Sequence, residues 1–221
     1  VSQQSRLDYL SPRRLGVTSF SGAGSDGDLE QDLALYGREA GLSYALDAQA
    51  RRMVVQQPNG QLEDYGGSLQ LQQRLTHADS LYFSAGGSRS ERGDVAPHYD
   101  PNDANRDLQV VETQEPHAFA GYHHEWSPES HTLALVSFLR DNLQLDHSRP
   151  GMFFIRESQG EIVSIATDPF VELNLDSRFS LGSAELQQIW STDRHQVVVG
   201  ARFQGGQVDS DTTLTRGLTG T

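Results

Sequence analysis

The sequence predicts an all-β protein, either an antiparallel transmembrane β-barrel or a partial barrel of about 8 to 10 strands. The first observation is a repeated unit in which two segments of alternating apolar and polar residues flank a short polar corner; residues 183–203, with the corner at 191–194, show it most clearly. The second observation is that the connections at 89–116 and 141–151 are much longer and polar. Short turns at one end of the strands and long loops at the other are typical of barrels that cross a membrane.

A third observation concerns the two tryptophans. Trp126 and Trp190 each stand at the same offset from a short corner, in the form Trp-Ser-x-x-x-His. Aromatic residues gather in this way where a strand passes the boundary between lipid and water. In a soluble sheet the same residues would close the end of a hydrophobic core, and the sequence leaves that reading open.

Composition restricts the classes of function. The chain has 221 residues, a net charge of -13 and no cysteine, which excludes disulfide bonds and thiolate metal sites. The negative charge argues against nucleic acid as a partner. No run of about 18 apolar residues is present, so we expect no membrane-spanning helix, whereas a strand crosses with about 9 to 11 residues. A mean hydropathy of -0.54 is compatible with such strands because half of their side chains face water.

We divide the chain into a linker or loop at 1–32, a β-barrel domain at 33–210 and a C-terminal tail at 211–221. The linker is rich in Ser, Gly and Asp. Residues 33–46 alternate and predict one strand, and the Pro-Asn-Gly sequence at 58–60 predicts a hairpin turn.

Three hairpins form the centre of the predicted domain. In the hairpin at 68–87, Leu71 is expected opposite Ala85. Around Trp126, pairing with His131 places Tyr122 opposite Leu135. In the third hairpin Trp190 pairs with His195, and Leu186 faces Val199. A smaller hairpin at 152–165 is expected to stand beyond the main wall.

The two-residue period of a strand separates the side chains of these hairpins into two faces. Side chains predicted to line a polar lumen are Gln70, Gln72, Arg74, His123, Glu125, Arg140, Glu185, Gln187 and Arg202. Side chains predicted to face lipid are Leu133, Leu135, Leu186, Val197, Val199 and Ala201. Aromatic residues predicted at the membrane interface are Tyr122, Trp126 and Trp190.

Motifs for catalysis and for cofactor binding were sought and are absent, so the sequence predicts no enzyme and no cofactor. Oxygen-rich side chains in the long loop are weak calcium candidates: Asp100, Asp103, Asn105 and Asp107. Leu108 stands where an EF-hand has its invariant glycine, so an ordinary surface loop is the other interpretation. His117, His123 and Glu125 share a predicted strand face, where they either bind zinc or line a hydrated interior.

The segments 185–190 and 199–204, together with Glu125 and Trp126, resemble barrel strands of TonB-dependent-receptor-like and porin-like outer-membrane proteins. More narrowly, they resemble barrels attached behind tetratricopeptide repeats in some bacterial envelope proteins. The resemblance implies a bacterial outer-membrane location, a lipid bilayer as partner, and a channel or the membrane anchor of a larger envelope assembly that includes other proteins. No plug domain is recognisable before Leu33, so energy-coupled uptake is not implied. The alternative is a soluble all-β binding module, such as a carbohydrate-binding sandwich.

Overall fold

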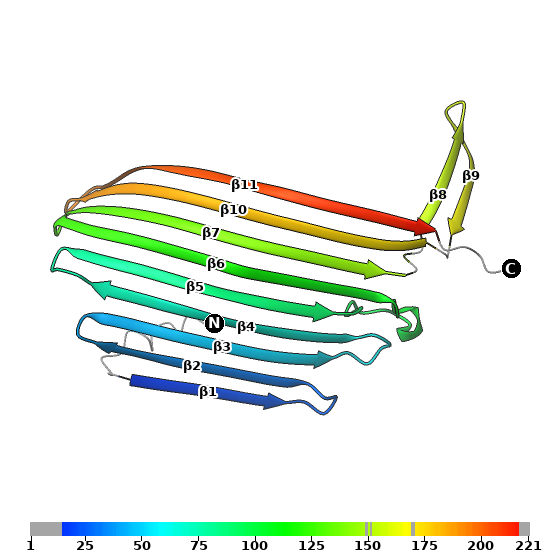
Figure 1. Cartoon of the computed structure of the whole chain (residues 1–221), viewed down its shortest axis with the longest axis horizontal. Helices are drawn as coiled ribbons and strands as arrows, with labels where there is room; N and C mark the ends of the chain where they lie inside the picture. The colour runs from blue at the N-terminus through cyan, green and yellow to red at the C-terminus, as the bar shows by residue number, and fades with distance from the viewer. Residues whose placement is uncertain (1–14, 149, 151, 169–170, 217–221) are drawn as a thin grey trace.

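The prediction of an all-β antiparallel protein is confirmed. The computed structural model describes residues 15–148, 150, 152–168 and 171–216, and this part of the chain contains eleven strands and one short 3-10 helix. Nine strands form one antiparallel sheet (Figure 1). Their bounds are β1 Leu15–Ala23, β2 Leu29–Glu39, β3 Leu42–Val54, β4 Gln61–Arg74, β5 Asp79–Arg92, β6 Leu108–Ser127, β7 Ser130–His147, β10 Val171–Ser191 and β11 Gln196–Arg216.

The strands of this sheet follow one another in chain order, from β1 at one edge to β11 at the other. Among the described residues β1 and β11 do not pair with each other, so the sheet is open. Strands β8 (Met152–Ser158) and β9 (Glu161–Asp168) form a separate two-stranded sheet that projects from the end of the main sheet, as the sequence predicted (Figure 1). The helix η1 (Pro101–Asp103) lies in the β5–β6 connection.

The shortest connections between strands of the main sheet lie at one end of it, which we call the turn end. They join β2 to β3, β4 to β5, β6 to β7 and β10 to β11 (Figure 1). The opposite end, which we call the loop end, carries the short turns at 24–28 and 55–60, the connection at 93–107 and the β8–β9 hairpin. The loop predicted at 89–116 is shorter than expected because β5 and β6 extend into it, and residues 141–147 of the loop predicted at 141–151 belong to β7.

A tight turn at Ala40 and Gly41 divides the segment 33–46, which was predicted as a single strand. Both residues have positive φ, 46° and 85°, as the two central residues of a type I′ hairpin turn require. Apolar residues continue on both sides of the turn, which is why the sequence pattern alone does not show it.

The sheet extends beyond the predicted domain at both ends of the chain. Strand β1 and the first residues of β2 lie inside the segment 1–32 predicted as a linker, and β11 runs into the segment 211–221 predicted as a tail. Small residues of β1 such as Ser19 and Ser21 conceal its alternation, but they continue the ladder against β2. Residues 1–14 and 217–221 lie outside the described part.

Two of the three predicted hairpin registers are displaced by two residues, which leaves each side chain on its predicted face. Leu71 lies opposite Phe83, and Leu186 lies opposite Ala201. We name the two faces of the main sheet after the last strands. Face A is the face that carries Leu186, its partner Ala201 on β11 and its partner Ala134 on β7. Face B is the opposite face, which carries Glu185 and its partner Arg202. The residues of the other strands are assigned to a face by the same cross-strand pairing.

The register predicted for the hairpin at Trp126 is wrong by one residue, because the structure has an irregularity between Glu125 and Ser127. Tyr122 therefore lies opposite Ala134 instead of Leu135. The error reverses the faces of β7. Arg140 lies on face A, apart from the other predicted lumen residues, and Leu133 and Leu135 lie on face B, apart from the other predicted lipid-facing residues.

The described sheet is a single layer with almost no core. Only five apolar residues are buried, and none of the described side chains is less than 2% exposed. The accessible surface is 15823 Å², against about 10,000 Å² expected for a folded soluble monomer of this mass. No helix in the described residues is long and apolar enough to cross a membrane.

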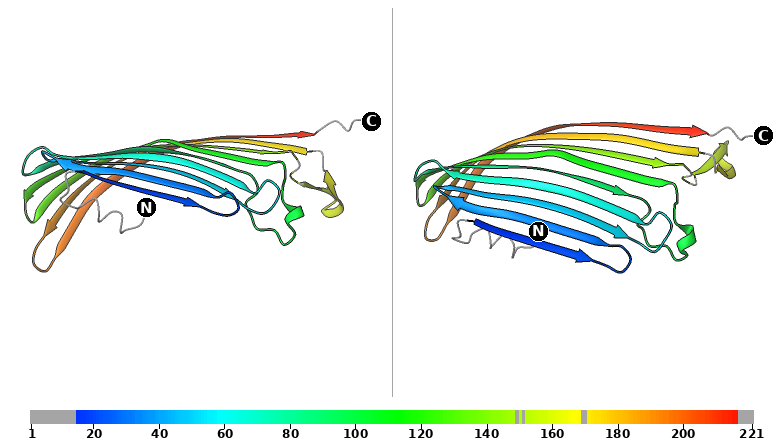
Figure 2. Two further views of the ribbon diagram at one scale, coloured as in Figure 1. Left: turned by 90° about the horizontal axis from the view of Figure 1, so that it is seen from below. Right: turned by 60° about the horizontal axis from the view of Figure 1, so that its bottom comes forward.

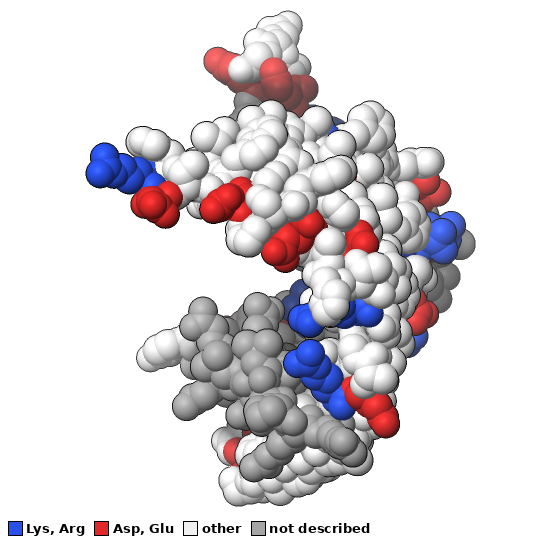
Figure 3. Space-filling view, turned by 90° about the vertical axis from the view of Figure 1, so that its left-hand side faces the viewer, with Lys and Arg blue, Asp and Glu red and all other residues white. Residues whose placement is uncertain are grey.

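The sheet is arched along its length (Figure 2). Seen from the turn end it forms an arc, with charged side chains along its hollow side (Figure 3). Three clefts, of 620, 480 and 510 Å³, are lined mainly by face B side chains. Face B is therefore the concave face over this part of the sheet.

Candidate functional site

The candidate site is the polar surface of face B near the turn end. The structure brings together on this face eight of the nine residues predicted to line a lumen, all except Arg140. These eight are Gln70, Gln72, Arg74, His123, Glu125, Glu185, Gln187 and Arg202. They belong to β4, β6, β10 and β11, so the site depends on the cross-strand register and on no single loop.

Glu185 is the centre of an ion-pair group on β10 and β11. The Arg202 Nε donates to Glu185 Oε2 at 2.6 Å, and an Arg202 terminal nitrogen contacts the same oxygen. Gln187 donates to the other carboxylate oxygen. The Glu185 side chain is 14% exposed and that of Arg202 is 58% exposed, so the carboxylate is largely covered while the guanidinium meets solvent. Both Glu185 and Gln187 line the 480 Å³ cleft.

His123 and His131 form a stacked pair at the turn end of face B. Their ring centroids are 5.2 Å apart, and His123 Nε2 lies 3.0 Å from His131 Nδ1. His131 Nε2 lies 3.1 Å from the carbonyl oxygen of Pro128, which can only accept. We therefore assign the proton of His131 to Nε2, and His123 donates to its Nδ1. The sequence showed His131 only as part of the corner, because the irregularity at Trp126 decides that the two rings meet.

Arginines from neighbouring strands complete the site. Arg38, Arg74, His123 and Glu125 line the 510 Å³ cleft. Arg38 interrupted the apolar alternation of its strand in the sequence, and that interruption was the available signal for it. The backbone N–H of Glu125 donates to the Ala78 carbonyl at 2.8 Å, which ties the end of β6 to the β4–β5 turn.

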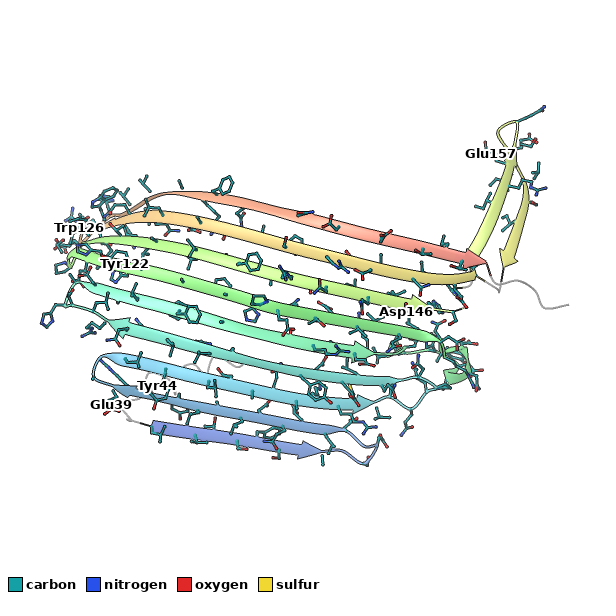
Figure 4. All side chains as sticks on the ribbon, in the orientation of Figure 1. Glu39, Tyr44, Tyr122, Trp126, Asp146 and Glu157 are labelled. Atoms are coloured by element: carbon teal, nitrogen blue, oxygen red, sulfur yellow. The ribbon has the colours of Figure 1, made fainter. Side chains whose placement is uncertain are left out.

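The predicted interface aromatics lie on face A at the turn end, where Figure 4 shows Tyr122 and Trp126. Trp126 is 68% exposed and its Nε1 donates to Thr132 Oγ1 at 2.9 Å. The Tyr122 hydroxyl donates to Asp79 Oδ1 at 2.6 Å, and His124 Nδ1 lies 2.7 Å from the same oxygen. Each ring thus has an exposed apolar body and a polar atom that is hydrogen-bonded.

The calcium candidates do not converge. Asp100 accepts from the backbone and side-chain nitrogens of Asn102 at 2.9 Å, so it caps η1. Asn105 donates from its backbone and side-chain nitrogens to Asp94. Among the described residues, no group of three or more His, Cys, Asp or Glu side chains could hold a metal ion, and this includes His117, His123 and Glu125.

Asp94 is the buried residue that organises the long loop, and the sequence analysis did not single it out. It is 3% exposed and accepts from the Ala96 amide, from His98 and from Asn105, at 2.8 to 3.2 Å. Burial alone would raise its pKa, but these hydrogen bonds to the charged form outweigh burial and lower the pKa to about 2.

The arrangement on face B can present hydrogen-bond donors, acceptors and charges of both signs to a solute in the clefts. A comparison with protein-family models finds no family that matches this chain, and a search of curated proteins finds no relative. The functional conclusion therefore rests on the geometry of the sheet.

Proposed function

We propose that this chain forms the wall, or part of the wall, of a transmembrane β-barrel in a bacterial outer membrane. The barrel acts as a channel for polar solutes or as the membrane anchor of a larger envelope assembly. Face A meets lipid and face B lines the polar interior. Closure of the wall requires strand pairing at the edges β1 and β11, beyond the pairing within the described sheet.

The proposal rests on two adjacent rows of residues on face A. A row here is the set of residues that lie opposite one another on successive strands. Each row runs through all nine strands without a charged or amide side chain, and the only hydroxyl belongs to Tyr44. The first row is Phe203, Ala184, Val136, Ala120, Phe83, Leu71, Tyr44, Gly37 and Leu15. The second row is Gly205, Gly182, Phe138, Ala118, Ala85, Leu69, Leu46, Leu35 and Val17. We call these two rows the apolar belt.

The belt is open to the surroundings. Phe203 is 75% exposed, Leu15 and Val17 are each 60% exposed, and Val136 is 55% exposed. Soluble monomers rarely expose a continuous apolar surface larger than a few hundred Å². An apolar band with aromatic residues at its border is what the hydrocarbon of a bilayer requires of a barrel.

Face B is more polar than face A at the same height. The row that lies between the two belt rows contains Gln204, Ser183, Ser137, Ser84 and Gln70. Its remaining members are Phe119 on β6 and Ala45, Tyr36 and Gly16 on β3, β2 and β1, so the row is polar mainly over β4, β5, β7, β10 and β11. The Ser137 and Ser183 hydroxyls are 2.6 Å apart, and Ser84 is buried. Polar side chains of this kind suit a hydrated interior.

The soluble binding module fits less well. A β-sandwich places a second layer against its apolar face, with the two sheets about 10 Å apart. In the described part of the chain, the sheet is one layer and β8 and β9 project away from it. The apolar belt therefore has no protein cover within this part.

Carbonate extraction of membranes from producing cells tests the proposal. A barrel wall stays in the membrane pellet and leaves it only in detergent. A soluble module appears in the carbonate supernatant, and recovery there without detergent would sink the membrane assignment.

A further inference from the structure

A second polar groove lies on face A, immediately beyond the apolar belt on the side of the loop end. Its volume is 670 Å³, and it is lined by side chains of β5, β6, β7, β10 and β11. Three arginines line it: Arg89, Arg140 and Arg178. The lumen on face B does not use this groove, because the sheet separates the two.

Arg140 lies at the border between the groove and the apolar belt. Its neighbour two residues away on β7 is Phe138, in the second belt row, and its guanidinium lies 6.0 Å from the Phe138 ring centroid. Ser130, which pairs with Trp190, lies ten residue steps before Arg140 on β7. At about 3.3 Å per step and a tilt of about 40°, these steps span about 25 Å along the membrane normal. That span matches the typical height of about 25 Å of a barrel's apolar band.

The guanidinium of Arg140 is also the most available charge of the groove. It is exposed and makes no ion pair among the described residues. Arg178 Nε contacts Asp176 at 3.3 Å, and Arg89 contacts Glu91 at 3.5 Å. The remaining carboxylate of the lining, Asp209, accepts from Gln207 at 2.8 Å.

Neutral donors surround the arginines. Ser180 lies opposite Arg140, and Asn142 lies opposite Arg178, with Thr113 beside Asn142 on β6. Guanidinium groups bind phosphate oxygens in a forked geometry, and hydroxyl and amide donors complete the coordination of such a group. A phosphate monoester whose chains lie on the belt would bring its charge to this height.

We propose that this groove binds the phosphate monoester headgroup of a membrane lipid, with Arg140 as the principal contact. The inference rests on the proposed function, because it places the belt in the bilayer. It names the class of lipid that binds to face A. Binding of the headgroup would also hold the barrel wall at a fixed depth in the bilayer.

The test uses the full chain in a neutral detergent and three soluble probes: dihexanoyl phosphatidic acid, dihexanoyl phosphatidylcholine and inorganic phosphate. Calorimetric titration should show the tightest binding for phosphatidic acid, since it offers both an anionic phosphate and acyl chains. Arg140→Gln should weaken that binding about tenfold, the loss expected for one charge-assisted contact. Arg52→Gln is the matched control, because Arg52 lies on face A outside the groove, and it should change binding less than about twofold.

Three results would overturn the site: equal binding by the native chain and Arg140→Gln, an equal loss in Arg52→Gln, or inorganic phosphate binding as tightly as phosphatidic acid. Circular dichroism confirms that the variant is folded. Flotation of the native chain with phosphatidylcholine vesicles separates the two proposals. A chain that floats without preferring phosphatidic acid removes the headgroup site alone, and a chain that does not float removes the membrane assignment.

Discussion

Asp94 holds the β5–β6 connection against the β3–β4 turn beside it. Its carboxylate accepts from Asn105, and Asn59 of the β3–β4 turn donates to the Asn105 and Leu108 carbonyls at 2.8 and 2.7 Å. Gln57 of the same turn donates to the Asp94 carbonyl. One buried carboxylate therefore connects two loops at the loop end.

Acid should release this loop before it unfolds the sheet. Because the folded pKa of Asp94 is lowered to about 2 from 3.8, its contribution is fully present above pH 3.8 and is lost as the pH falls through about 2. Hydrogen exchange at the Asn105 amide should accelerate in that window. Asp94→Asn should give fast exchange already at neutral pH, with Asp100→Asn as the control that leaves exchange at Asn105 slow. Exchange that is unchanged in Asp94→Asn would contradict the assignment.

Glu185 and Arg202 should be coupled, but modestly. Removing the guanidinium in Arg202→Gln leaves a largely covered carboxylate without its partner, so it should cost more than Glu185→Gln, which leaves an exposed guanidinium. A double-mutant cycle on the free energy of unfolding should give a coupling of about 1 kcal/mol, since the arginine is more than half exposed. Additive single and double variants would show that the two side chains do not interact in solution.

At the scale of the strand, the irregularity at Trp126 decides which residues of β7 share a face. A displacement by two residues in the other hairpins was harmless, whereas a displacement by one reversed Leu133, Leu135 and Arg140. The antiparallel strands, most corners and the common face of eight of the nine residues predicted to line a lumen follow from the two-residue period. The irregularity does not, because its extra residue depends on pairing with a neighbouring strand. Likewise, the ion pair and the histidine stack depend on distances that no pattern contains.

Single cysteines test the corrected register directly, since the chain has no native cysteine. Val136→Cys on face A should react with apolar, membrane-dissolved maleimides, and Leu135→Cys on face B should react with water-soluble ones. The register predicted from the sequence gives the reverse pattern. Labelling of both positions by the same reagent would mean that the sheet does not separate lipid from water at this height.

On strand β11, an added arginine should destabilise the protein more on face A than on face B. Val199→Arg places a guanidinium on face A and should destabilise the protein in a bilayer by about 2 to 4 kcal/mol if the site lies near the midplane. Gln204→Arg adds the same group on face B of β11 and should cost about 0 to 1 kcal/mol. Urea unfolding in vesicles measures both. Equal costs for the two variants would argue against a lipid-facing face A.

At the scale of the whole molecule, both faces carry charge, and the charge of face A lies outside the two belt rows. Among the described side chains, face B carries eight carboxylates against five arginines, and face A carries nine carboxylates against four arginines. The carboxylates of face B are Glu30, Asp32, Asp47, Asp64, Glu112, Glu125, Asp141 and Glu185. The arginines of face B are Arg38, Arg51, Arg74, Arg92 and Arg202. The long loop adds Asp94, Asp100, Asp103 and Asp107 at the loop end.

If face B lines a channel, its excess of carboxylates sets the sign of selectivity. The interior attracts cations, and the preference falls as salt shortens the Debye length from about 30 Å at 0.01 M to about 3 Å at 1 M. Reversal potentials in planar bilayers should therefore show a cation preference that is largest in dilute salt. Asp64→Asn combined with Glu112→Gln should reduce it by roughly twofold, because both residues lie on face B. Glu157→Gln is the control, since Glu157 lies on the separate β8–β9 hairpin (Figure 4). A current without cation preference, or an equal effect of Glu157→Gln, would remove the selectivity and leave the role as a membrane anchor, because that role depends on face A alone.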